Sequence, residues 1–156
     1  LSIKKNNLCD IIKVYDSNIE VRKKLKERLS PNEIYESLEE TVFDADLVVL
    51  CIPVGSMKDV AKSISKLLKD GCILTDTGST KNSVINDVKP YISQNIWFIP
   101  SHPLAGTENS GPEAGFSELF KGKYWVIVPY YSIPKEVMDN FSKFLSGSGE
   151  QDDMNR

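Results

Sequence analysis

Residues 45–52 read Ala-Asp-Leu-Val-Val-Leu-Cys-Ile and lead directly into Pro53. A run this short and this continuously apolar is typical of a parallel strand that is buried on both faces. The residues after it carry apolar side chains at helical spacing, at Met57, Val60, Ala61, Ile64, Leu67 and Leu68. A buried strand followed by an amphipathic helix is the repeating unit of α/β folds, so this stretch decides the expected class.

The same alternation continues on both sides of this unit. Toward the C-terminus, the sequence predicts strands at residues 71–76, 96–100 and 124–128, and helices at residues 80–91 and 137–145. Toward the N-terminus, it predicts the end of a helix at residues 1–8, a strand at 11–16 and a weaker strand at 34–38. Ser17 or Asn18 is expected to cap a helix between those two strands. The pattern predicts an α/β fold with a Rossmann-like, doubly wound parallel sheet over residues 1–145.

Composition excludes several classes of protein. The chain has 156 residues, of which 40% are hydrophobic and 26% charged, with a net charge of −3, as in a soluble globular domain. The sequence lacks the basic face of a nucleic-acid binder and any apolar run near the ~20 residues of a membrane span. Its three cysteines are too widely spaced for a disulfide framework or a zinc site, so we expect no metal and a cytoplasmic location. Cys51 and Cys72 lie in apolar runs and are expected to be buried.

Functional residues of doubly wound sheets gather beyond the carboxyl ends of the strands. In this sequence those positions are Asp16, Pro53, the segment 76–81 and the segment 101–111. We therefore expect Asp16 and Pro53 to lie beside a bound dinucleotide.

Asp16 closes a predicted strand, where an acidic residue binds the adenosine ribose hydroxyls of a dinucleotide. Counting back about 20 residues places the glycine fingerprint at or before Leu1, and no G-x-G-x-x-G occurs in the chain. The expectation is that the first strand and glycine loop are missing, which would leave unpaired edges on the strands at 11–16 and 45–52. The alternative is that Asp16-Ser17 only begins a turn and caps a helix. A carboxylate here favours NAD, and Ser17 beside it leaves NADP open.

Two loops carry the remaining polar residues. Asp76-Thr77-Gly78-Ser79-Thr80-Lys81 joins a strand to a helix, as an ordinary turn or as a helix N-terminus that binds a polar ligand. Ser101 to Gly111 contains His102, the one histidine of the chain, at the end of a predicted strand. Imidazole is suited to taking a hydroxyl proton near neutral pH, so His102 is a candidate base.

The first loop has the pattern Asp76-x-Gly78-Ser79-x-Lys81. The second reads His102-Pro103-Leu104-Ala105-Gly106-Thr107-Glu108-x-Ser110-Gly111 and is followed by Leu119-Phe120-x-Gly122. With these loops, the chain from about Val14 to Pro129 resembles the prephenate/arogenate dehydrogenase family. The block around His102 is the most specific part of the resemblance.

The resemblance implies an oxidoreductase of tyrosine biosynthesis that oxidatively decarboxylates prephenate or arogenate and passes a hydride to NAD or NADP. It implies that His102 takes the proton of the ring hydroxyl and that Ser79 orients that hydroxyl beside the cofactor. Gly106 and Thr107 match positions that line the substrate pocket. The family also has a helical C-terminal domain that forms a homodimer, and residues 146–156 are expected to be a linker toward it.

Two other interpretations remain open. One is a different Rossmann-type enzyme such as a β-hydroxyacid dehydrogenase, which uses a catalytic lysine and does not need the His102 block. The other is a non-catalytic fragment or regulatory binding module that keeps the sheet without turnover. The sequence does not choose between prephenate and arogenate.

Overall fold

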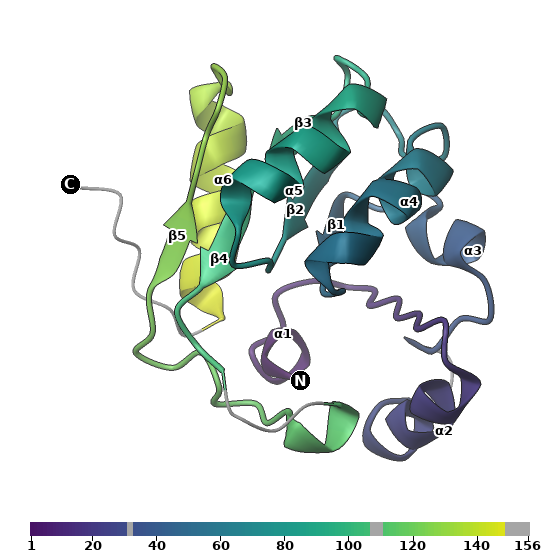
Figure 1. Ribbon diagram of the computed structural model, residues 1–156. Coiled ribbons are helices and arrows are strands. Elements are labelled where there is room, and N and C mark those ends of the chain that lie inside the picture. The colour runs from purple at the N-terminus through teal and green to yellow at the C-terminus, as the bar shows by residue number, and fades with distance from the viewer. Residues whose placement is uncertain (31–32, 107–110, 149–156) are drawn as a thin grey trace.

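The central sheet of the computed structural model is parallel, and its three strands lie between two layers of helices (Figure 1). The structure describes residues 1–30, 33–106 and 111–148. The strands are β1 (Leu47–Leu50), β2 (Ile73–Asp76) and β3 (Trp97–Ile99), in the order β1-β2-β3. Their register pairs Leu50 with Asp76 and Thr75 with Ile99, so the carboxyl ends of the strands meet at one edge.

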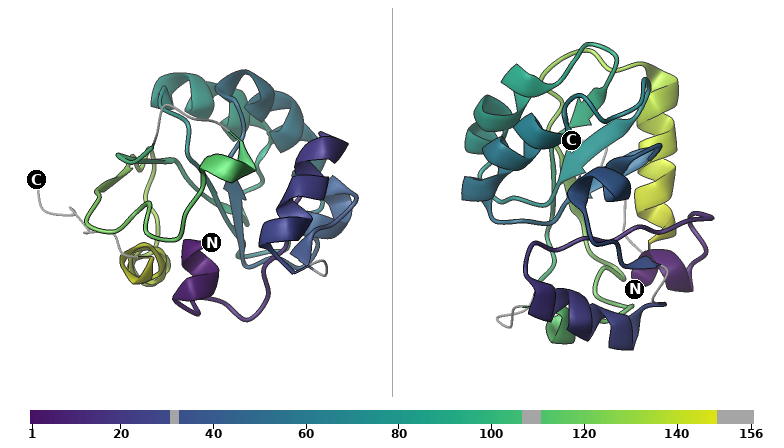
Figure 2. Two further views of the ribbon diagram at one scale, coloured as in Figure 1. Left: turned by 90° about the horizontal axis from the view of Figure 1, so that it is seen from below. Right: turned by 90° about the vertical axis from the view of Figure 1, so that its right-hand side faces the viewer.

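Helices cover both faces of this sheet, as the doubly wound prediction requires (Figure 2). One face packs against α4 (Val54–Ile64) and α5 (Lys81–Val88), whose buried residues form the larger core with Leu74 and Phe98. The other face packs against α6 (Lys135–Gly147) through Phe141 and Leu145, which contact Ile99. In the apolar run at residues 45–52, Leu50 is buried while Leu47, Val48 and Val49 are only partly buried. As an edge strand of the described sheet, β1 is therefore less enclosed than the run predicted.

A second, two-stranded sheet extends from the end of β3. It consists of β4 (Ser101–Pro103) and β5 (Trp125–Ile127), which pair antiparallel with His102 opposite Val126. The strand predicted at residues 124–128 therefore forms, but it does not continue the parallel sheet. The prediction of a loop at Ser101–Pro103 was wrong. These residues form a strand because β5, more than twenty positions further along the chain, pairs with them.

The N-terminal part is the least regular. It contains α1 (Ser2–Lys5), α2 (Ile19–Arg28) and α3 (Leu38–Val42). The side chain of Asn18 caps α2 by accepting a 2.9 Å hydrogen bond from the backbone of Glu20, which confirms the predicted cap. The strands predicted at residues 11–16 and 34–38 were wrong, since only one parallel bridge joins Val14 to Ile34. Among the described residues, no strand lies beside residues 11–16 to extend this pairing, and Ile11 is 73% exposed.

Contacts between segments far apart in the sequence join the N-terminal helices to the C-terminal half of the chain. Ser2 donates a 2.7 Å hydrogen bond to the carbonyl of Ser148, so α1 lies beside the end of α6 (Figure 2). The short helix η3 (Pro112–Ala114) packs on α2, where Arg28 donates to the carbonyls of Pro112 and Gly115. A further short helix, η2 (Lys89–Tyr91), continues α5. The described part of the chain has no helix of the length and hydrophobicity that a membrane span requires.

Candidate functional site

The end of β2 and the start of β4 meet around Asp76. Its side chain is fully buried, at 0% exposure. One carboxylate oxygen, Oδ2, accepts a 2.8 Å hydrogen bond from the backbone of Gly78 and a charged one from Lys81. The other, Oδ1, accepts a 3.2 Å bond from the backbone of Ser101, whose hydroxyl donates to the Asp76 carbonyl at 2.9 Å. Asp76 thus joins the loop after β2 to the first residue of β4.

Lys81 begins α5 and turns its amine inward. The ammonium also donates to the carbonyl of Ser101, and the side chain is only 12% exposed. Burial lowers the pKa of Lys81 below its usual value of 10.5, although the carboxylate of Asp76 acts in the opposite direction. A buried ion pair of this kind compensates a costly charge and is not by itself a strong source of stability.

His102 lies in the middle of β4 and is half-buried. Its Nδ1 is 2.8 Å from the carbonyl oxygen of Thr77, in the loop after β2. A carbonyl can only accept, so Nδ1 carries the proton, and in the neutral ring the lone pair is on Nε2. This is the tautomer in which Nε2 can act as a base.

The other predicted site residues lie near this contact to different degrees. Ser79 is exposed, two positions after Thr77, and within the described chain no hydrogen bond joins it to His102. Gly106 is exposed, and a Cβ there would meet no atom within 4 Å. Pro53 follows β1 and begins the turn into α4, also exposed. Thr107 lies outside the described residues.

Asp16 has the turn role that the sequence left open. Its Oδ1 accepts a 2.8 Å hydrogen bond from the backbone of Asn18, so the carboxylate stabilises the start of α2. Of the interactions described, none uses the second carboxylate oxygen. The turn is confirmed, whereas the cap of α2 is Asn18, and the role of Asp16 toward a ribose stays a prediction.

The roles of Thr77, Lys81 and Ser101 were not predicted from the sequence. The carbonyl of Thr77 has no side-chain signal, because any residue supplies one. A signal did exist for Lys81, since an acidic residue at the end of an otherwise apolar strand needs a compensating charge once it is buried. The start of the following helix is within reach of that strand end.

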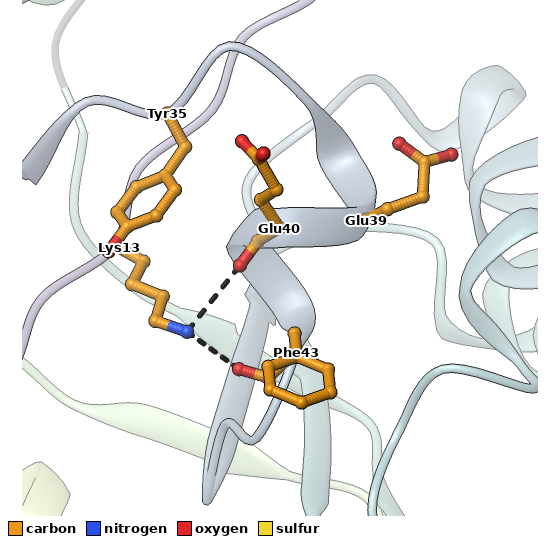
Figure 3. A pocket seen from close by; sticks show the side chains of 5 residues that line it. All are labelled: Lys13, Tyr35, Glu39, Glu40 and Phe43. Atoms are coloured by element: carbon orange, nitrogen blue, oxygen red, sulfur yellow. Dashed lines mark hydrogen bonds between the residues drawn. The ribbon is translucent and has the colours of Figure 1, made fainter.

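Two shallow surface pockets are prominent in the described part of the chain, and His102 lines neither of them. The first, of about 460 Å³, is lined by Lys13, Tyr35, Glu39, Glu40 and Phe43 (Figure 3). Lys13 donates at 2.6 Å to the carbonyl of Phe43 and lies over the ring of Tyr35, so it stabilises the end of α3. We therefore interpret this pocket as a surface feature of the packing around α3.

The three cysteines are free thiols. Cys72 is buried, as predicted, and burial raises the pKa of its thiol to about 11. The prediction for Cys51 was wrong, because this residue is exposed just beyond the carboxyl end of β1. Among the described residues, no group of His, Cys, Asp and Glu side chains could hold a metal ion.

A parallel sheet covered on both faces, with polar residues gathered at the carboxyl ends of its strands, defines a dinucleotide-binding type of α/β domain. Residues 1–151 match the family described as prephenate dehydrogenase, nucleotide-binding domain. The chain belongs to this family. The family match sets aside the interpretation as a β-hydroxyacid dehydrogenase.

Individual relatives agree with the family match. A cyclohexadienyl dehydrogenase of Zymomonas mobilis is 38% identical over 127 residues, which cover 81% of this chain and 43% of that protein. The crystal structure of prephenate dehydrogenase from Aquifex aeolicus superposes with a TM-score of 0.85 at 26% identity, over 97% of this chain and 54% of that one. The same A. aeolicus enzyme in complex with hydroxyphenyl propionate and NAD+ gives a TM-score of 0.84. The chain thus spans about half the length of these relatives.

Proposed function

We propose that this chain is the cofactor-binding part of an NAD-dependent dehydrogenase that oxidatively decarboxylates prephenate or arogenate in tyrosine biosynthesis. The observation that carries the proposal is the 2.8 Å contact between His102 Nδ1 and the Thr77 carbonyl, at the ligand-binding edge of the sheet. It fixes an imidazole in the tautomer that can take a proton through Nε2.

The proposed role of His102 follows from the electron and proton balance of the reaction. The substrate loses a hydride from the ring carbon that bears its hydroxyl, and the ring carboxylate leaves as carbon dioxide. NAD, when bound, supplies the acceptor for that hydride. His102 Nε2 takes the hydroxyl proton as the C=O bond forms, and returns it to the phenolic oxygen once the ring is aromatic. Aromatisation drives the reaction, so the protein needs mainly orientation and one base.

The residues present fit the nicotinamide and ribose parts of a dinucleotide along the edge of the sheet, although the sequence contains no glycine fingerprint for its pyrophosphate. Pro53 and Ser79 are exposed at the ends of β1 and β2, where the nicotinamide half would lie. Asp16, whose second carboxylate oxygen is not engaged among the described interactions, would bind the adenosine ribose. The A. aeolicus structure that contains NAD+ supports this choice of cofactor.

The surroundings of Asp16 favour NAD over NADP. An enzyme that takes NADP needs a cation for the 2′-phosphate, commonly an arginine. Arg22 is the arginine beside Asp16, and its guanidinium already donates to the carbonyl of Ser17 at 3.3 Å and to the carboxylate of Glu36 at 3.2 Å. The carboxylate of Asp16 would also repel a phosphate.

Further parts of the proposal concern the whole protein. Ser79 would orient the substrate hydroxyl toward His102, and Gly106 and Thr107 would line the substrate pocket. Residues 1–145 would form the cofactor-binding domain, with 146–156 leading toward a helical domain that forms a homodimer. The helix α6 ends at Gly147, and residues 149–156 lie outside the described chain. Three free thiols support a cytoplasmic location, where cysteines stay reduced.

The second candidate function is a binding module without turnover. The specific observation in its favour is that no hydrogen bond joins Ser79 to His102 in the part of the chain that is described, so the proposed pair is not assembled in this structure. The two candidates differ in whether NADH is produced.

The experiment that tests the proposal follows NADH absorbance with the full-length protein, each cofactor being combined with prephenate and with arogenate. We expect NADH from at least one of the two substrates, and faster turnover with NAD than with NADP. NAD binding without turnover of either substrate would contradict the proposed reaction and favour the binding module.

A further inference from the structure

Both polar backbone atoms of Ser101, the residue before His102, are held by charged side chains. Its N–H donates to Asp76 Oδ1 at 3.2 Å, and its carbonyl accepts from the ammonium of Lys81. Ser101 is fully buried, at 0% exposure. The backbone that carries His102 is therefore fixed in position by a carboxylate and an amine.

The same carboxylate also fixes the residue that His102 contacts. Asp76 Oδ2 accepts the backbone N–H of Gly78 at 2.8 Å, which holds the peptide group between Thr77 and Gly78. The carbonyl of that peptide group accepts the hydrogen bond from His102 Nδ1 at 2.8 Å. Asp76 thus sets both ends of the contact, the strand that carries the donor and the peptide that carries the acceptor.

Lys81 is the cation that allows Asp76 to do this as an anion. Asp76 has 0% exposure and Lys81 12%, so water screens the pair only weakly. A buried carboxylate without a cation would be costly, and it would tend to take up a proton or draw in water. Because burial lowers the pKa of Lys81 in spite of its partner, the pair is poorly explained by stability alone.

We propose that Asp76 and Lys81 are a positioning pair, which holds His102 against the Thr77 carbonyl and keeps the proton of the neutral ring on Nδ1. Neither residue touches the substrate in this account; both act through the backbone of Ser101 and of the loop after β2. The geometric part of the inference stands on the contacts above. Its consequence for turnover rests on the proposed function.

A single-histidine chain allows a direct test. In the 156-residue chain labelled with 15N only at histidine, the ring nitrogens of His102 are the one imidazole signal, and their chemical shifts report the tautomer. At about pH 8, where an imidazole is neutral, we expect the wild-type ring to carry its proton on Nδ1. In Lys81→Met, which keeps length and removes charge, we expect a mixture of tautomers.

Three further variants complete the test. Lys81→Arg keeps the cation and should retain the wild-type tautomer; a mixture there would contradict the requirement for a cation. Lys69→Met removes a partly buried lysine that pairs with Asp44 and Asp46 before the amino ends of β1 and β2, the opposite edge of the sheet from His102, and should leave the ring unchanged. If Lys81→Met does not fold, Asp76→Asn with Lys81→Met removes both charges, and a mixture is again expected.

A folded Lys81→Met or double variant whose ring stays entirely in the wild-type tautomer would overturn the proposal. This result does not depend on turnover, so it is separate from the fate of the proposed function. If prephenate or arogenate is turned over, Lys81→Met should lower kcat by roughly 10-fold to 100-fold, part of the 10²–10⁴ that a positioned base contributes. The KM should change little, because the substrate contacts remain.

Discussion

Removing the charge of Lys81 should destabilise the fold far more than removing a surface lysine. In Lys81→Met, the carboxylate of Asp76 loses its cation at 0% exposure. Breaking a buried pair in this way costs about 3–5 kcal/mol, because an uncompensated charge stays behind. Combining it with Asp76→Asn removes that charge, so the double variant should lose only about 1–3 kcal/mol. This is the value of two hydrogen bonds, the one from Lys81 to the Ser101 carbonyl and one from a backbone N–H that the amide cannot accept.

Urea unfolding of the wild type, of Lys81→Met and of the double variant, followed by circular dichroism, gives the free energies of unfolding. Lys69→Met is the matched control, because Lys69 also contacts two carboxylates but its partner Asp46 is 95% exposed. An exposed pair of this kind contributes about 0–1 kcal/mol. The reasoning is refuted if Lys81→Met costs no more than Lys69→Met, or if the double variant is as unstable as the single one.

Three further predictions concern the core and the loop. In Gly78→Ala, the new Cβ would lie 3.1 Å from the Asp76 carboxylate, so the free energy of unfolding measured in urea should fall by about 1–3 kcal/mol. An unchanged free energy of unfolding would mean that the loop shifts to accommodate the Cβ. Phe141→Ala should cost about 3–5 kcal/mol by calorimetry because Phe141 is 1% exposed, whereas Phe43→Ala, at 68% exposure, should cost under about 0.5 kcal/mol. Burial raises the pKa of Cys72 from 9.0 to about 11, so the folded chain disfavours the thiolate and stability should fall as pH rises through this window. The fall, about 2 kcal/mol, should disappear in Cys72→Val when unfolding is measured between these pH values; an unchanged fall would place its cause elsewhere.

The sheet could be predicted where a segment carries its own pattern. The apolar run at residues 45–52 and the helical stripe after it are local signals, and β1 and α4 form where they predict. The strand at residues 11–16 has a similar β-branched composition, yet it makes a single bridge, because a strand forms only beside a neighbour that completes its ladder. The partner of β4 lies too far along the chain for a local pattern to reveal it.

The candidate site, like the sheet, could be predicted only in part from the sequence. The placement of His102 and of the loop after β2 at one edge follows from the rule for parallel strands, and the structure brings them to within a hydrogen bond. The orientation of the ring depends on a backbone carbonyl and on the buried contacts of Asp76. Such contacts arise from tertiary packing, and the sequence encodes them only as an acidic residue at a strand end.

The most direct test of the account is turnover by full-length protein in which His102 is replaced by asparagine. The asparagine amide has an N–H that can still donate to the Thr77 carbonyl, but it cannot act as a base. With NAD binding intact by calorimetry, we predict that NADH formation from prephenate or arogenate falls by about 10²–10⁴-fold. NADH formation at the wild-type rate in His102→Asn would contradict the central claim that His102 is the base of this site.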